Sequence, residues 1–175
     1  GANNTAVGQS ALSANTTAAQ NTAVGTNSMV TNTTGANNTG LGMNALYANT
    51  TASNNTSVGY GSMENNSTGA QNTAVGTEAL KANTTASNNT AMGYRALYAN
   101  TTGGRNVAVG NYALDSQTTA GSYNVGVGYA VGDSVSTAQG VTLIGDVAGD
   151  AITTSSGCTA VGQSALSTHA TGTAN

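Results

Sequence analysis

The sequence predicts an all-β protein, a parallel β-solenoid of ten 17-residue coils. Ten marker glycines recur every 17 residues, with one interval of 18, and a fixed period identifies a repeat protein. An aliphatic residue precedes every marker glycine, and leucine or methionine follows four positions later in eight of the ten units. Only 5% of the residues are charged and Phe and Trp are absent, which excludes a thick aromatic core. The marker glycines are Gly8, Gly25, Gly42, Gly59, Gly76, Gly93, Gly110, Gly128, Gly145 and Gly162.

Each unit offers two short strands, because its apolar pieces span four or five residues and are separated by Gly and Asn-Thr-Thr. In the fifth unit the first piece is 72–75 and the second contains Ala79 and Leu80. We expect the marker glycine to turn one strand into the next, through a positive φ or a close backbone approach. Asn-Thr-Thr forms the second corner. Stacked at about 4.8 Å, ten such coils form a rod roughly 48 Å long.

Alternation along the first strand places Val75 and Thr73 on one face and Ala74 on the other. We expect the valine to face the core and the small residue to face outward, where it would permit close approach by another chain. One coil buries only about 3 to 5 kcal/mol of apolar transfer free energy, less than the cost of ordering its backbone. We therefore expect a homo-oligomer, either a homotrimer of packed or intertwined chains or a filament.

Two columns of asparagine are expected to pair amide to amide along the rod. The first column begins each unit: Asn4, Asn21, Asn38, Asn55, Asn72, Asn89, Asn106 and Asn124. The second column, the corner ladder, comprises Asn15, Asn32, Asn49, Asn66, Asn83 and Asn100.

The Asn-Thr-Ala-Val-Gly piece at 72–76, followed by a small-residue turn and a second short piece, resembles the head repeats of trimeric autotransporter adhesins. It is also similar to the Asn-Thr-Ala-Val-Gly-Tyr-x-Ala-Leu repeats of bacteriophage tail fibres and large bacterial surface proteins. The resemblance covers essentially the whole chain, most clearly residues 3–119. It implies a left-handed parallel β-roll, three chains around an axis, and binding of host surface molecules through the outside. The 17-residue unit is longer than the unit of those heads.

We interpret residues 1–175 as one repeat array, a fragment of a longer fibre. Its predicted sections are regular coils at 1–128, divergent coils at 129–157 and a return of the regular unit at 158–175. In the divergent section Val135 and Ile152 replace the corner asparagine, and Gly132 and Gly149 replace the leucine. We expect the cross-section of the rod to change there.

The ionisable residues favour a chain that is not an enzyme and has no cofactor. His169, the single histidine, occupies a corner-ladder slot and is interpreted as a substitution in the ladder. Asp133 and Asp150 occupy equivalent positions in adjacent coils, with Asp146 nearby. A Ca²⁺ site made by these aspartates and backbone carbonyls, or a set of solvated surface acids, is expected there.

Charge and hydropathy restrict the partners. The net charge of −3, with three Lys and Arg residues in all, argues against binding to nucleic acid. The longest apolar stretch falls short of the roughly 18 residues that would cross a bilayer, so we expect no membrane insertion in this segment.

Two sets of residues are candidates for the outer surface. Tyrosines in the variable slots could stack on sugars or cover neighbouring coils: Tyr47, Tyr60, Tyr94, Tyr98, Tyr112 and Tyr129. Sequons for N-glycosylation begin at Asn3, Asn15, Asn32, Asn37, Asn49, Asn54, Asn65, Asn66, Asn83, Asn88 and Asn100.

These features predict a fibre segment that gives reach and attachment to a host-surface glycan or protein receptor, located outside the cell, on the cell surface or on a virion. An ice-binding solenoid is the alternative, since regular threonine arrays can order water. The adjacency of Thr84 and Thr85 argues against it, because one strand face presents alternate residues. A polysaccharide-processing β-helix enzyme would need clustered acids and bases that this chain lacks.

Overall fold

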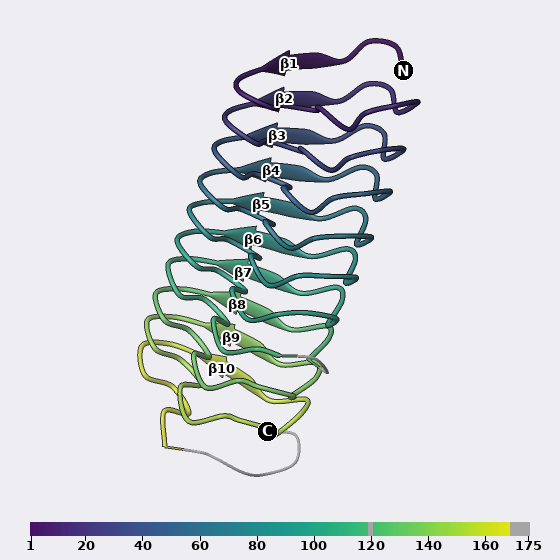
Figure 1. Ribbon diagram of the computed structural model, residues 1–175. Helices are drawn as coiled ribbons and strands as arrows, with labels where there is room; N and C mark the ends of the chain where they lie inside the picture. Colours follow the sequence, from purple (N-terminus) through teal and green to yellow (C-terminus); the bar gives the residue numbers. More distant parts are fainter. Residues whose placement is uncertain (119–120, 169–175) are drawn as a thin grey trace.

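The computed structural model describes residues 1–118 and 121–168 as a column of coils stacked along one axis, with the first and last coils at opposite ends (Figure 1). Each of ten coils contributes one three-residue strand, and all ten strands lie in one parallel sheet in chain order. The predicted fold class, an all-β parallel solenoid, is confirmed. The strands are β1 (Thr5–Val7), β2 (Thr22–Val24), β3 (Thr39–Leu41), β4 (Thr56–Val58), β5 (Thr73–Val75), β6 (Thr90–Met92), β7 (Val107–Val109), β8 (Val125–Val127), β9 (Thr142–Ile144) and β10 (Thr159–Val161).

The strand register is continuous along the rod. Equivalent residues face one another in adjacent coils, and Val107 still pairs with Val125 across the 18-residue interval. The extra residue is accommodated at the corner. There, Gln117 donates to the carbonyl of Gly121, four residues later, whereas Asn100 donates to Gly103, three residues later.

The second strand of each unit is a wrong prediction. Ala79 and Leu80 are buried in a turn, and Leu80 has a φ of 53°. Its N–H donates to the carbonyl of Ala96 in the next coil at 2.9 Å. Backbone bonding between coils therefore continues here, but the left-handed conformation prevents an extended strand.

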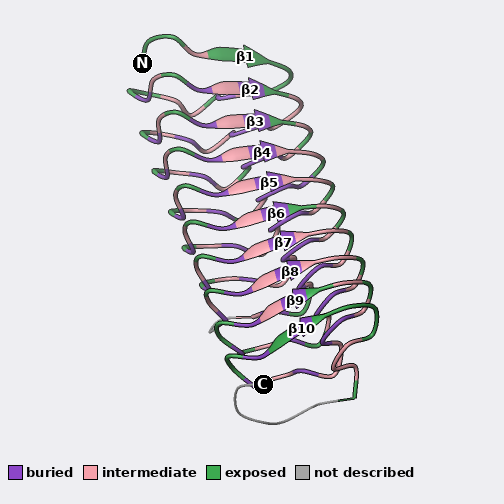
Figure 2. Ribbon diagram, turned by 180° about the vertical axis from the view of Figure 1, so that it is seen from behind, coloured by how far each residue is buried: buried purple, intermediate pink, exposed green. Residues whose placement is uncertain are grey.

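The direction of the strand side chains is also opposite to our expectation. Ala74, Ala91 and Ala108, at the strand centres, are completely buried, while residues at the strand ends face out (Figure 2). The interior leaves no space for larger groups, since a Cβ on Gly126 would lie 2.8 Å from Cγ of Leu114. In the regular coils the leucine or methionine of the turn fills the interior, and the small strand residue packs against it.

The marker glycines have both of the properties expected of them. Their φ values lie between 124° and 145°, a region that L side chains rarely adopt. The coils also approach closely, because a Cβ on Gly59 would lie 2.5 Å from the carbonyl oxygen of Gly76. The turns after β1 to β9 therefore require glycine for conformation and for stacking, whereas a Cβ on Gly162, after β10, would meet nothing within 4 Å.

The two asparagine columns are buried but bond differently. In the corner ladder, amide pairs with amide as predicted: Asn83 Nδ2 donates to Asn66 Oδ1 at 2.6 Å. In the first column, side chain bonds to backbone instead, because Asn55 Oδ1 accepts from the backbone N–H of Asn72 at 2.9 Å. The prediction of amide pairing is wrong for that column. Both arrangements satisfy buried polar groups without charge.

The divergent section retains the backbone of the regular coils and changes its side chains. The N–H of Gly132 donates to Ala148 of the next coil, as equivalent leucines do elsewhere. Leu143 of β9 fills the space of the missing leucines, since a Cβ on either Gly132 or Gly149 would lie 2.7 Å from its Cδ1. In the divergent section, therefore, the side chains that fill the interior change, while the backbone bonding between coils continues.

Candidate functional site

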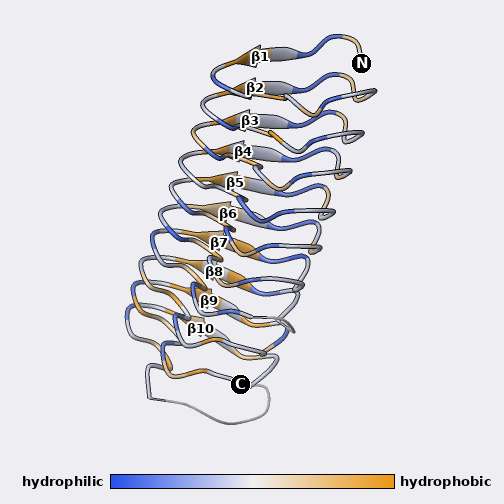
Figure 3. Cartoon of the chain, viewed as in Figure 1, coloured by the Kyte–Doolittle hydropathy of each residue, from blue (hydrophilic) through white to orange (hydrophobic). Residues whose placement is uncertain are grey.

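The outer face of the sheet carries an aliphatic row that runs the length of the rod. It consists of Val7, Val24, Leu41, Val58, Val75, Met92, Val109, Val127, Ile144 and Val161. Four internal members, at the ends of β2, β3, β6 and β9, are exposed by 36% to 44%, and the others within the rod are half-buried. The row follows the hydrophobic ends of the strands (Figure 3). An aliphatic row with exposed members along its length is a candidate interaction surface.

A second row starts the same strands and points to the same side, two residues before the aliphatic row. It consists of Thr5, Thr22, Thr39, Thr56, Thr73, Thr90, Val107, Val125, Thr142 and Thr159. The threonine row and the aliphatic row thus run side by side on the outer face of the sheet. Sequence reasoning missed this threonine row because it directed these side chains inward.

The tyrosines divide into accessible and covered rings. Tyr94, Tyr112 and Tyr129 form an edge-to-face series with centroid distances of 5.2 and 6.1 Å. Arg95 lies 4.1 Å from the centre of the Tyr98 ring, so its guanidinium covers one face of that ring. Tyr47, Tyr60, Tyr94 and Tyr129 are 39% to 57% exposed and remain candidates for stacking on sugars.

The cations within the array are largely neutralised by neighbouring acids. Lys81 Nζ lies 2.7 Å from Glu78 and 3.3 Å from Glu64, and its hydrogen bond to Glu78 is the largest cause of its raised pKa. Arg95 pairs with Asp115 at 3.4 Å. Lys81 and Arg95 each therefore have a carboxylate partner.

The aspartates do not form the expected metal site. Asp146 lies in another column, where Gln163 donates to it at 3.3 Å. The acid that continues the column of Asp133 and Asp150 is Asp115, which sequence reasoning missed although it occupies the equivalent position five residues after its marker glycine. Within residues 1–118 and 121–168 no group of three His, Cys, Asp or Glu side chains could hold a metal ion. The Ca²⁺ prediction has no support there.

Burial separates the predicted sequons. Asn32, Asn49, Asn66, Asn83 and Asn100 are fully buried in the corner ladder, so a glycan on them is incompatible with the folded coil. Asn15 is partly buried. The side chains of Asn3, Asn37, Asn54, Asn65 and Asn88 are exposed, and glycosylation there stays a prediction.

His169 lies outside the described residues. None of the described residues belongs to a helix long and apolar enough to cross a membrane. No protein-family model, curated protein or solved structure matches the chain. The candidate site is therefore assigned from geometry alone, as the outer sheet face with its threonine and aliphatic rows.

Proposed function

We propose that this chain is a non-catalytic segment of an extracellular, cell-surface or virion-borne fibre, where it provides reach and carries attachment surfaces. The observation that carries the proposal is the aliphatic row, which continues through all ten coils while the threonine row is interrupted by Val107 and Val125. A stiff, in-register rod supplies length, and an apolar row along that length supplies a surface for assembly.

Further copies of the same chain are the partners that fit this face best. Strands in adjacent coils are about 4.8 Å apart, and a second rod with the same spacing can match every aliphatic residue along its length. Charged residues are absent from both rows, so no desolvated charge opposes the contact. The small strand residues that were expected to face outward and admit another chain are buried, so the prediction that they face outward is wrong. The copy number of three rests on the resemblance to adhesin heads alone.

Light scattering of the purified chain tests the assembly. We expect a mass that is a multiple of 16.9 kDa, threefold if the resemblance extends to the copy number. Val58→Glu with Val109→Glu should shift the mass toward the monomer, because each places a charge in the contact. Thr51→Glu with Thr68→Glu, at exposed corner positions, is the matched control and should not. A wild-type monomer at high concentration contradicts the assembly proposal.

Ice binding is the second candidate, and one observation favours it. The threonines of β1 to β6 stand at alternate positions with aliphatic residues on one regular face, which removes the objection drawn from Thr84 and Thr85. The same face would serve assembly or ice, not both at once. Thermal hysteresis that is lost in Thr56→Glu and unaffected by Thr68→Glu would support ice binding, whereas absence of hysteresis in a monomer would exclude it.

A further inference from the structure

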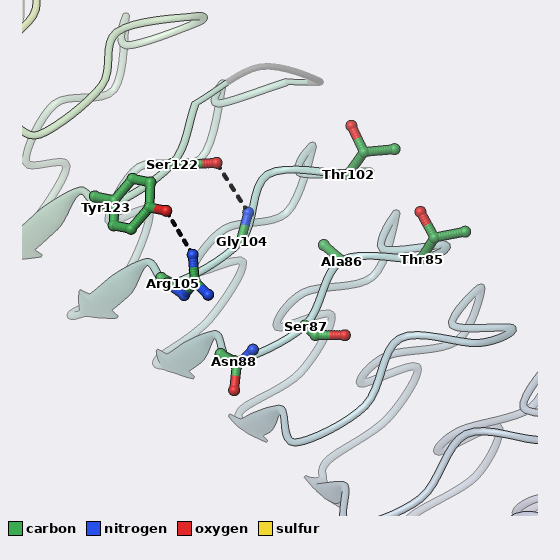
Figure 4. Close-up of a pocket in the computed structure, with 9 residues that line it drawn as sticks. All are labelled: Thr85, Ala86, Ser87, Asn88, Thr102, Gly104, Arg105, Ser122 and Tyr123. Atoms are coloured by element: carbon green, nitrogen blue, oxygen red, sulfur yellow. Dashed lines mark hydrogen bonds between the residues drawn. The ribbon is translucent and has the colours of Figure 1, made fainter.

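A groove of about 300 Å³ interrupts the regular surface at the Asn-Thr-Thr corner of the middle coils (Figure 4). Its lining contains the hydroxyl side chains of three successive coils, one arginine and one tyrosine. The lining residues are Thr85, Ala86, Ser87, Asn88, Thr102, Gly104, Arg105, Ser122 and Tyr123. No Asp or Glu belongs to it.

The groove exists because one column of the repeat changes its chemistry here. The column lies five residues before the marker glycine of the following coil and has left-handed φ values of 59° to 72° between Gln20 and Gly157. Amide residues or glycine fill it elsewhere: Gln20, Asn37, Asn54, Gln71, Asn88, Gly140 and Gly157. Arg105 and Tyr123 are the exceptions, in adjacent coils. They replace a short amide or glycine with a long side chain that carries a cation or an aromatic ring.

Arg105 and Tyr123 form one unit. The Arg105 guanidinium lies 5.2 Å from the centre of the Tyr123 ring, and its Nη1 donates to the Tyr123 hydroxyl. The tyrosine is 55% exposed. Lys81 and Arg95 have carboxylate partners, but within the described parts of the chain no carboxylate lies within ion-pair distance of Arg105. A cation without a carboxylate partner therefore lies beside an exposed aromatic ring, one face of which the guanidinium approaches.

The other lining groups suit a ligand with many hydroxyls. Ser87 Oγ accepts from the N–H of Ala70 at 3.0 Å, and Ser122 Oγ accepts from the N–H of Gly104 at 3.1 Å. Each bond fixes the serine oxygen and leaves its hydroxyl hydrogen to donate. Gly104 contributes no side chain at the position where adjacent coils place these serines, which opens the space between them.

We propose that this groove binds an acidic saccharide, with Arg105 holding the carboxylate, the Tyr123 ring stacking on the sugar face and the serines donating to sugar oxygens. The proposal deepens the attachment role of the fibre and rests on it. A neutral sugar would leave Arg105 without a carboxylate partner. An acidic peptide offers one backbone acceptor per residue, whereas a sugar ring presents several oxygens to the hydroxyl donors.

Calorimetric titration with tetragalacturonate, with neutral galactotetraose as the comparison, tests the proposal. We expect saturable binding of the acidic tetramer and at least tenfold weaker binding of the neutral one, because a charged hydrogen bond is lost. Amide chemical shifts should move at 85–88, 102–105 and 122–123. Sodium acetate at matched carboxylate concentration should not reproduce these shifts.

Two variants retain the column's own chemistry and so the fold. Arg105→Gln and Tyr123→Asn introduce residue types already present at Gln71 and Asn88, with similar φ values. We expect Arg105→Gln to weaken binding about tenfold or more. Gln71→Asn, in the same column but outside the groove, is the matched control and should bind as wild type.

Several results would overturn the proposal: no saturable binding, equal binding of the neutral tetramer, an equal response to acetate, or unchanged affinity in Arg105→Gln. The assay does not depend on the number of chains in the assembly. Failure to bind the saccharide would therefore contradict the groove proposal and leave the assembly proposal unaffected. A monomeric rod that binds the saccharide would contradict assembly and support the groove.

Discussion

At the marker glycines from Gly8 to Gly145, a positive φ and a close approach to the next coil both restrict the residue, and Gly59 is the example used for the test. Its φ is 131°, and a Cβ would lie 2.5 Å from the carbonyl oxygen of Gly76. Gly59→Ala must therefore distort the turn and also separate two coils. We expect a loss of about 3 kcal/mol or more in the free energy of unfolding, measured by urea denaturation.

Gly140→Ala is the control for this prediction. Gly140 also has a positive φ, 66°, but a Cβ there would meet nothing within 4 Å. Its substitution should cost only about 1 to 2 kcal/mol, the conformational part. Equal losses in the two variants would show that contact between coils is not what requires glycine.

Asp133 gives the rod a dependence on pH. Burial first, and then the neighbouring Asp150 carboxylate, raises the pKa of Asp133 above its ordinary value, against the attraction of Arg95. The folded chain therefore binds this proton more tightly than the unfolded chain does. Ionised Asp133 therefore lowers the stability of the folded chain. This loss of stability has its full size at neutral pH, and it disappears as the pH falls through the folded pKa toward the unfolded value of about 3.9.

We expect the melting temperature to rise on acidification from pH 7 toward pH 4. Asp133→Asn should stabilise the neutral protein by less than about 1 kcal/mol, since solvent screens this group, and should flatten the pH profile. Asp115, whose pKa burial also raises, accounts for part of the remaining slope. Asp146→Asn, in the other column, is the control. A profile in Asp133→Asn as steep as that of wild type contradicts the assignment.

At the scale of one element, Leu143 of β9 fills the space that the turn leucine fills in regular coils, because residue 132 is glycine. The energetic coupling between positions 132 and 143 can be measured. Leu143→Ala should leave a cavity and cost about 2 to 5 kcal/mol. Gly132→Leu should overpack the coil, because its Cβ would lie 2.7 Å from Leu143 Cδ1, at a cost of about 1 to 3 kcal/mol. The double variant restores the regular pairing of a turn leucine with a strand alanine at Gly132, and leaves the space beside Gly149 unfilled.

We therefore expect the double variant to be less destabilised than the sum of the single variants by about 0.5 to 3 kcal/mol. Urea denaturation of all four proteins measures this coupling. Gly140→Leu combined with Leu143→Ala controls for general effects, since Gly140 contacts nothing that Leu143 fills. Strict additivity for Gly132 and Leu143 would contradict the exchange.

The period of the sequence predicts the coil, but not the direction of its strand. Alternation in Thr73-Ala74-Val75 is compatible with either face inward, and general hydrophobicity favours the valine. The structure buries the alanine because Leu80, in a left-handed turn, already fills the coil. A turn that carries the largest buried side chain has no signature in strand or helix periodicity, so the second strand was also predicted wrongly.

For the whole rod, columns of equivalent residues carry information that motifs do not. The corner ladder was predictable because it repeats an amide whose only buried partner is another amide or a carbonyl. The groove was not predicted, since Arg105 and Tyr123 interrupt a column once and match no motif. Reading each column for its exceptions would have found them, and the same reading adds Asp115 to the acids.

A one-dimensional array should change its length in whole coils. Inserting a second copy of residues 26–76 after Gly76 adds three complete repeats, and every added strand finds a partner in register. We expect the rod to lengthen by about 14 Å while it keeps its cooperative melting. Small-angle X-ray scattering measures the change in maximum dimension. A second copy of residues 34–76 instead adds two and a half repeats, which places Asn-Thr-Thr where the marker turn belongs, and should disrupt stacking on both sides of the insertion. If both insertions gave rods of equal order, the coils would not need their marker glycines in register in order to stack. If only the complete repeats were tolerated, the spacing between the groove and either end of the rod could be varied one coil at a time.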